Sequence, residues 1–313
     1  MSDSLPHRLW VYQRERFPLL GHAPLIWCFS LSAMAFSARL HDDVGGLLGD
    51  PRFGLAAVTA FVTCLIFFLQ LRIADEFKDY KEDCQYRPYR AVPRGLVTLR
   101  LLAVIFVLGA VVQLALALWL EPRLVWVLAV AWAYLALMSH EFFAREWLKA
   151  RPITYMWTHM MIMPLVDLYA TACHWLVRDF SLSPGLKWFL VASFFNGLVI
   201  EIGRKLRAAD DEETGVPTYT KLWGRRRAPW VWWGVLAVTA GAAMLAAQEI
   251  GFLLPVALVV GLALGVAVIL VVGFLRAPVA GAGKRFELVS GLWTIVLYLV
   301  LGIVPFGWHY LTQ

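Results

Sequence analysis

The sequence predicts an all-α protein of the membrane, with nine transmembrane helices in one bundle around a central cavity. The chain of 313 residues is 60% hydrophobic and only 16% charged, whereas about a quarter of the residues in a soluble domain are charged. Apolar runs of roughly 18 to 25 residues, long enough to cross a bilayer, recur along the chain. Backbone groups in lipid must be bonded internally, so helices are the only sensible form for these runs.

Nine such runs follow one another, and we expect each of them to form a membrane-spanning helix. The fifth run contains Asp167 and two histidines, and the sixth contains Asn196, so these two runs carry polar residues within the expected span. No soluble domain is visible between the runs, and residues 1–313 are therefore expected to form a single domain. The runs cover residues 23–40, 54–74, 101–120, 122–140, 153–175, 186–203, 228–247, 251–275 and 286–308.

The basic residues predict how these helices are oriented. If the N-terminus is cytoplasmic, the inside segments carry 23 of the 28 lysines and arginines and the outside segments carry 5. This bias follows the positive-inside rule. The net charge of +6 is therefore better explained by membrane orientation than by nucleic-acid binding, and no nucleic-acid partner is expected. We expect a multi-pass protein of the cell (inner) membrane with a cytoplasmic N-terminus.

A dense cluster of acids follows the second run, in the segment RIADEFKDYKED that begins at Arg72. Asp75, Asp79 and Asp83 are spaced by four, which on a helix places them along one face. Like charges at this spacing repel one another. Carboxylates so arranged suit Mg²⁺, whose remaining positions are filled by water and substrate phosphates. Glu76 flanks the cluster, and the alternative interpretation is a solvated helix end with alternating charges.

An arginine-rich turn, YRPYRAVPRG, comes directly after the acids. Its two prolines and its terminal glycine predict a non-helical conformation. Arg90 and Arg94 carry guanidinium groups, which match phosphate oxygens, and they lie within a few residues of the carboxylates. The combination suggests a diphosphate held by metal on one side and arginine on the other. For any one of these arginines, an anionic lipid headgroup is the alternative ligand.

A second mixed-charge segment, EIGRKLRAADDEETG, follows the sixth run. Glu201 is followed by bases three and four residues later, which on a helix favours ion pairs. Asp210 and Asp211 lie among four consecutive acids that cannot all face one ligand, so a purely structural role is the alternative here. Because the two acidic segments follow the second and sixth runs, we expect the segments 72–95 and 201–224 to share one site.

Other polar residues lie in or beside the fifth and sixth runs. Asp167 is a carboxylate within a membrane run, which is costly unless it faces a polar cavity or a partner. His159 has no second histidine at i+4, which favours packing and pocket lining over metal ligation. Lys149 and Arg151 in the preceding loop are candidates to cap an anionic substrate, although membrane orientation alone also accounts for bases there. The candidate pocket residues are Tyr155, His159, Asp167, Asn196 and Glu201.

These segments resemble the two aspartate-rich motifs of the UbiA-type intramembrane prenyltransferases. The first family motif is Asn-Asp-x-x-Asp-x-x-x-Asp, and DEFKDYKED supplies Asp75, Glu76, Asp79 and Asp83 in register. The sequence YRAVPRG is similar to the turn that follows this motif in the family. Asp75 replaces the usual Asn and Glu76 replaces the usual Asp, so oxygen ligands are retained at both positions.

The second family motif, Asp-x-x-x-Asp before a glycine, is matched only in part. Asp211, Gly215, Thr218 and Gly224 fit the motif, whereas Arg207 stands where the first Asp belongs. This departure affects which residues can hold the second metal ion, and with it the usual reaction with the acceptor. The acids that are candidates to compensate are Glu201, Asp210 and Glu212.

The resemblance spans nearly the whole chain and implies transfer of an isoprenyl group from an isoprenyl diphosphate to a lipophilic, aromatic acceptor within the membrane. It implies two Mg²⁺ ions, which stabilise the departing diphosphate. A terpene cyclase of the same superfamily is the alternative enzyme. A secondary transporter is disfavoured because the acids gather at one membrane surface and not at the midplane.

The resemblance also assigns roles to the candidate residues, while the oligomeric state stays open. The catalytic candidates are Asp75, Asp79, Asp83 and Asp211. The candidates for binding the diphosphate are Arg72, Arg90, Arg94, Lys149, Arg151 and Lys205. The candidate Mg²⁺ ligands are Asp75, Glu76, Asp79, Asp83, Asp210 and Asp211.

Overall fold

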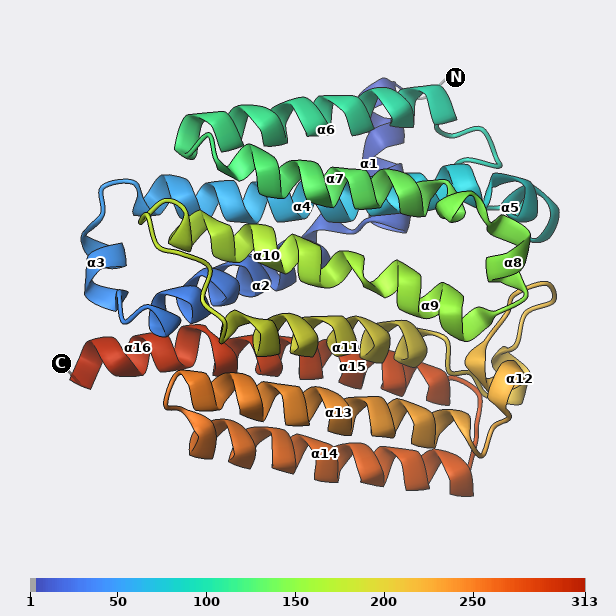
Figure 1. The fold of residues 1–313 in the computed structure, drawn as a ribbon. Helices are drawn as coiled ribbons and strands as arrows, with labels where there is room; N and C mark the ends of the chain where they lie inside the picture. The colour runs from blue at the N-terminus through green and yellow to red at the C-terminus, as the bar shows by residue number, and fades with distance from the viewer. Residues whose placement is uncertain (1–3, 313) are drawn as a thin grey trace.

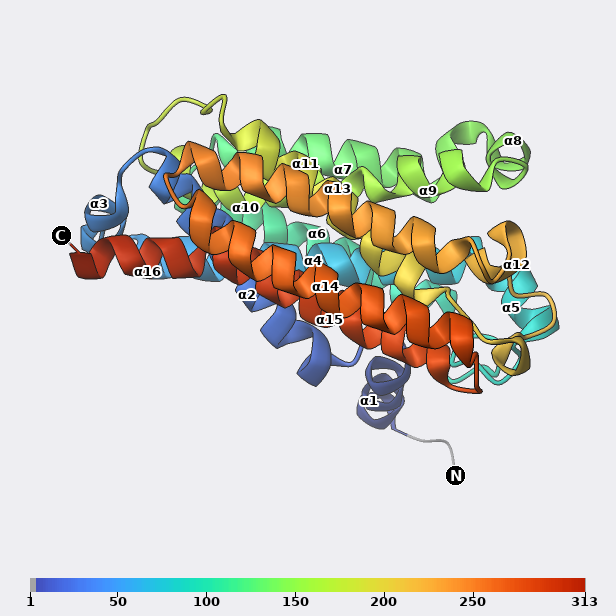
Figure 2. The same cartoon turned by 90° about the horizontal axis from the view of Figure 1, so that it is seen from below.

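The computed structural model describes residues 4–312, and within this range it contains helices and no strands. The long helices run side by side in one bundle (Figures 1 and 2). Among the described residues, seven helical segments are long and apolar enough to cross a membrane, which confirms the all-α membrane fold class. They are α2 (Leu19–Leu40), α4 (Phe53–Lys78), α6 (Leu99–Leu120), α11 (Leu186–Arg204), α13 (Ala228–Glu249), α14 (Leu253–Arg276), and α15 (Ala282–Leu301) taken together with α16 (Ile303–Thr312).

The two remaining expected spans differ from simple long helices. The fourth, α7 (Leu124–Ser139), is apolar but has only 16 residues. The fifth is divided into α9 (Pro152–Met160) and α10 (Ile162–Trp175). Pro164 explains the division. Proline has no N–H to donate to the carbonyl four residues earlier, and that carbonyl belongs to Met160, where α9 ends. The count of nine spans and the cytoplasmic N-terminus stay predictions.

The same cause separates α15 from α16. Pro305 stands four residues after Leu301, the last residue of α15. Gly302, at the break, lies against the backbone of Ser32 in α2, where a Cβ atom would clash. The break therefore coincides with a close crossing of the C-terminal helix over α2.

Short helices cluster at the two ends of the bundle. In both views, α5 (Tyr80–Tyr86), α8 (Arg145–Lys149) and α12 (Tyr219–Trp223) lie at one end, which we call the motif end. The helix α3 (Val44–Gly49) and the C-terminus lie at the opposite end (Figure 1). Helix α1 (Leu5–Arg16) stands apart from the bundle near the motif end (Figure 2). Two 3₁₀ turns, η1 (Glu141–Phe143) and η2 (Ala209–Asp211), complete the elements.

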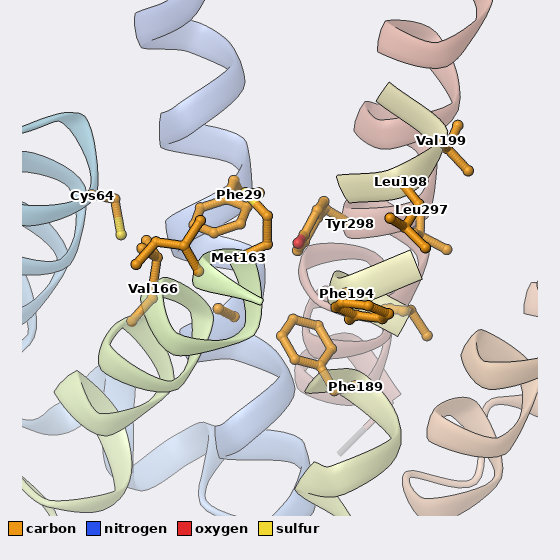
Figure 3. Close-up of a cluster of buried hydrophobic side chains, with 14 of the residues drawn as sticks. Phe29, Cys64, Met163, Val166, Phe189, Phe194, Leu198, Val199, Leu297 and Tyr298 are labelled. Carbon is orange, nitrogen blue, oxygen red and sulfur yellow. The ribbon is translucent and has the colours of Figure 1, made fainter. Parts of the chain in front are cut away.

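Helix α10 packs against both α4 and α11 and so fixes the distance between the two helices that carry the motifs. The rings of Phe29, Phe189 and Tyr298, from α2, α11 and α15, meet in the core, with centroids 4.8 Å apart for Phe29 and Tyr298 and 5.9 Å apart for Phe189 and Tyr298 (Figure 3). Close packing of this kind holds helices together in lipid, where burial of apolar surface contributes little to the association of helices. The core thus forms a rigid support for the motif end.

Candidate functional site

The first acidic segment lies where α4 ends and α5 begins. Helix α4 extends to Lys78, and Asp79 forms the junction with α5 at φ −94° and ψ 2°. No group of three or more histidine, cysteine or acidic side chains close enough to hold a metal ion is present among residues 4–312. The three aspartates expected on one face therefore do not converge on a single point, and their side chains have different surroundings.

Asp75 is surrounded by bases but remains accessible. Its carboxylate lies 3.6 Å from the Arg72 guanidinium and 3.2 Å from the Lys78 ammonium, and 38% of its side chain is exposed. Arg204 of α11 also interacts electrostatically with Asp75 from across the site. Asp75 of the first segment is therefore influenced by a base of the second segment.

Asp79, one turn further on, offers an unused carboxylate. The side-chain carboxylate of Asp79 makes neither a hydrogen bond nor an ion pair within the described part of the chain. Burial raises the pKa of its carboxyl above the ordinary value, the Lys78 ammonium opposes this, and the Asp75 charge adds to it. A partly buried carboxylate beside another one has a strong preference for a cation. Asp75 and Asp79 thus fit Mg²⁺, which proteins commonly bind through one or two carboxylates plus substrate phosphates.

Glu76 and Asp83 are engaged by arginines. Glu76 is 2% exposed and forms an ion pair with Arg16 of α1. Asp83 is 1% exposed, and it lies 2.8 Å from both Arg87 and Arg90. Both acids were expected among the metal ligands, which stays a prediction; in the structure Glu76 pairs with α1 and Asp83 pairs with the arginine-rich turn.

Helix α1 contributes to the site in a way that the sequence did not indicate. Besides the Arg16 contact, Glu15 pairs with Arg94 at 2.7 Å and Arg8 donates a hydrogen bond to the Leu96 carbonyl. These contacts fix the turn that follows α5. Arg90 and Arg94, expected to bind diphosphate, are therefore already paired with carboxylates. No spacing rule links α1 to a turn some 80 residues later, so sequence reasoning had no signal for this.

An apolar pocket of about 340 Å³ lies beside α1, bounded also by α4 and α6. Its walls include Trp10, Leu69 and Ile73, and none of its lining residues is acidic or basic. The pocket is therefore separate from the charged site at Asp75 and Asp79.

The C-terminal end of α11 brings the second segment to the site. Glu201 lies 2.6 Å from both the Arg204 guanidinium and the Lys205 ammonium. The Lys205 ammonium also lies 5.8 Å from the centre of the Tyr219 ring, whose hydroxyl is next to Glu201. Close approach of α11 to α15 requires Gly203, because a Cβ atom there would collide with Ser290. The sequence correctly predicted ion pairs at Glu201.

The loop after α11 uses its acids for structure. The Gly281 N–H donates to both carboxylate oxygens of Asp211, at 2.8 and 3.0 Å. Thr218 and Thr220 donate to Glu212 at 2.7 and 2.8 Å. Burial disfavours the charged form of Glu212, but these bonds and Lys221 outweigh burial and lower the pKa of its carboxyl. Asp210 is exposed on the surface.

The tip of this loop rests on α5. Gly215 adopts φ 76° and lies against the Tyr86 ring, where a Cβ atom would clash. Glycine is suited to this position because positive φ is costly for residues with a side chain. The contact places the second segment directly beside the first, as the sequence predicted.

The loop between α7 and α9 borders the site on a third side. Lys149 of α8 pairs with Glu82 of α5, and the Arg151 guanidinium lies 4.5 Å from the centre of the Trp147 ring. Tyr155 stacks on His159 at 3.9 Å, and the Lys78 ammonium lies 5.4 Å from the Tyr155 ring centre. Tyr155 therefore faces the acids, while Lys149 and Arg151 lie at the rim.

Asp167 and Asn196 lie in the core and have no exposed surface. The Tyr298 hydroxyl donates to Asp167 at 2.7 Å, and the Thr294 hydroxyl donates to Asn196 at 3.2 Å. One oxygen of Asp167 and the amide nitrogen of Asn196 lack a partner. Asp167 is eight residues beyond His159, about 12 Å along a helix. Both residues are thus deeper than the charged site.

A comparison with known protein families shows the family to which the chain belongs. The model of the UbiA prenyltransferase family matches residues 25–287. The chain belongs to the UbiA prenyltransferase family. A comparison with curated protein sequences gives no match.

Two solved structures share this UbiA fold. The apo structure of a UbiA homolog from Aeropyrum pernix K1 has a TM-score of 0.67 and 13% identity, with 90% of this chain and 97% of that chain covered. A structure described as digeranylgeranylglyceryl phosphate synthase in membranes has a TM-score of 0.59 and 11% identity, with 96% and 99% covered. At these identities the likeness shows the fold. Both acidic segments, 72–95 and 201–224, lie within the residues matched by the family model.

Proposed function

We propose that this UbiA-family protein transfers an isoprenyl group from an isoprenyl diphosphate to a lipophilic, aromatic acceptor, with Mg²⁺ as the cofactor. One observation supports this most strongly: the accessible Asp75 and the unpaired Asp79 lie beside the bases Arg72 and Lys78 on α4. Carboxylates for a metal and bases for phosphate, at the end of an apolar bundle, suit a diphosphate whose hydrocarbon tail enters the membrane.

In this proposal Asp75 and Asp79 would hold the ion, and the ion would supply positive charge to neutralise the diphosphate. Arg72 and Lys78 bind the phosphate oxygens and favour departure of this leaving group. The Tyr155 ring faces the same space and stabilises positive charge on the isoprenyl carbon that is released. The C–O bond breaks with its electron pair left on the diphosphate, and the acceptor forms a bond to the carbon and passes a proton to the released diphosphate.

The location of the site follows from the distribution of bases. With the N-terminus in the cytoplasm, the motif end lies at the cytoplasmic side of the cell membrane. We propose that residues 1–313 act as one domain there.

The test is release of diphosphate by the purified full chain in lipid nanodiscs, with Mg²⁺ and isoprenyl diphosphates of several lengths. Asp79→Ala is expected to abolish release while the protein stays folded. Glu213→Ala, at an exposed acid of the neighbouring loop, is the matched control and should retain activity. The proposal is overturned if no chain length gives release, or if Asp79→Ala retains near-normal activity.

Extraction of the products into organic solvent separates transfer from cyclisation. Transfer requires an added acceptor and gives a prenylated product. A cyclised hydrocarbon or alcohol formed without any acceptor would replace the transferase assignment by the cyclase one.

A further inference from the structure

The second half of the site presents bases to the first half. Arg204 and Lys205 both pair with Glu201, and their side chains remain 42% and 37% exposed. Arg204 interacts electrostatically with Asp75 on α4. Arg204 at the end of α11 therefore lies within electrostatic reach of the carboxylate proposed as the first metal ligand, and Lys205 lies beside Arg204 on the same glutamate.

The acids of the second motif are used elsewhere. Asp211, which matches the motif, accepts two hydrogen bonds from the Gly281 N–H at the start of α15. Arg207, at the position of the missing aspartate, donates from its guanidinium to the neighbouring Leu206 carbonyl. Asp211 could bind a second metal ion only by leaving its contact with the Gly281 N–H, and Asp210, the other candidate ligand of this segment, is exposed on the surface.

The charge balance of the site also favours one metal ion. Four bases and three acids leave one net positive charge, and one divalent ion would raise it to three. A diphosphate ester carries about three negative charges when fully ionised, so one ion suffices for neutrality. A second ion would leave an excess of two positive charges in a partly buried site, which is costly. The groups counted are Arg72, Lys78, Arg204 and Lys205, with Asp75, Asp79 and Glu201.

We propose that Arg204 and Lys205 bind the diphosphate directly in place of a second metal ion, so that this protein binds one divalent ion together with its substrate. The inference rests on the proposed function, since it concerns how the same diphosphate is held. A guanidinium fork binds two phosphate oxygens at once, and an ammonium adds a point charge. Glu201 acts as a positioning residue that holds both bases toward the site.

The first experiment counts metal ions with inorganic diphosphate, a probe that does not depend on isoprenyl chain length. Binding of Mn²⁺ to the full chain in nanodiscs is measured by electron paramagnetic resonance with and without the probe. We expect one Mn²⁺ per chain in the presence of diphosphate. Two ions per chain would overturn the inference and leave the proposed function intact. Absence of any diphosphate-dependent Mn²⁺ binding would overturn both.

The second experiment tests the bases directly. Arg204→Gln and Lys205→Gln should each raise the Kd for inorganic diphosphate about tenfold, as expected for loss of one charge-assisted hydrogen bond. The Mn²⁺ count should stay at one. Arg204→Lys keeps the charge and should recover part of the affinity. Arg226→Gln, at an exposed base just before α13, is the matched control. Unchanged diphosphate affinity in both glutamine variants, with unchanged melting temperature, would refute direct binding.

Discussion

Asp83 provides the sharpest test of how the first motif works, because the structure and the family motif suggest different roles for it. Its side chain is 2% exposed, and those of Arg87 and Arg90, both within 2.8 Å, are 15% and 22% exposed. We expect Asp83→Asn to loosen the arginine-rich turn and lower stability while leaving metal binding intact. A metal ligand at this position would give the opposite pattern.

The magnitude follows from the burial of the three side chains. Removal of one partner from a buried ion pair costs about 3–5 kcal/mol. Both arginines retain some contact with water, and asparagine keeps one oxygen that accepts a hydrogen bond. About 2 kcal/mol is therefore expected, which for a chain of this size lowers the melting temperature by about 3–6 °C.

The cysteines of the protein provide the assay. Cys64 and Cys173 are fully buried, so a thiol-reactive fluorescent dye reports their exposure on thermal unfolding. Cys84 is exposed and Cys28 is partly exposed, so both would react in the folded state and are replaced by serine in every variant. Glu213→Gln is the matched control, since this acid is exposed and is not a candidate metal ligand. If Asp83→Asn melts like the control and fails to bind Mn²⁺ in the presence of inorganic diphosphate, the structural role is refuted.

Two further predictions concern contacts that hold the site together. Glu76→Gln leaves Arg16 without its carboxylate and should cost about 2–4 kcal/mol, seen as faster proteolysis of α1; equal cleavage rates in the variant and the wild type would contradict this. Because the pKa of Glu212 is lowered, its bonds to Thr218 and Lys221 stabilise the fold at pH values above 4.5, the ordinary pKa of a glutamate. This stability is lost as the pH falls through the lowered pKa of Glu212 in the folded state. Below about pH 4.5 the melting temperature of the wild type should therefore fall more steeply with pH than that of Glu212→Gln. Equal pH dependence of the two melting temperatures would contradict the assignment.

Several features of the chain were determined by the sequence alone. Apolar runs and the distribution of bases indicated a helical membrane protein. The spacing of Asp75 and Asp79, which matches the family motif, indicated the family. The divided fifth span was readable in principle from Pro164, because a proline interrupts the helix at a fixed distance. Local rules of this kind involve residues within a few positions of one another.

Only the tertiary structure decided which carboxylates are available to a ligand. Spacing by four places Asp75, Asp79 and Asp83 on one helix face, but it does not tell which base approaches each of them. Arg16 reaches Glu76 from 60 positions away, and Arg204 meets Asp75 because α10 packs between α4 and α11. An ion pair depends on distance in space, and distance between remote residues is set by helix packing.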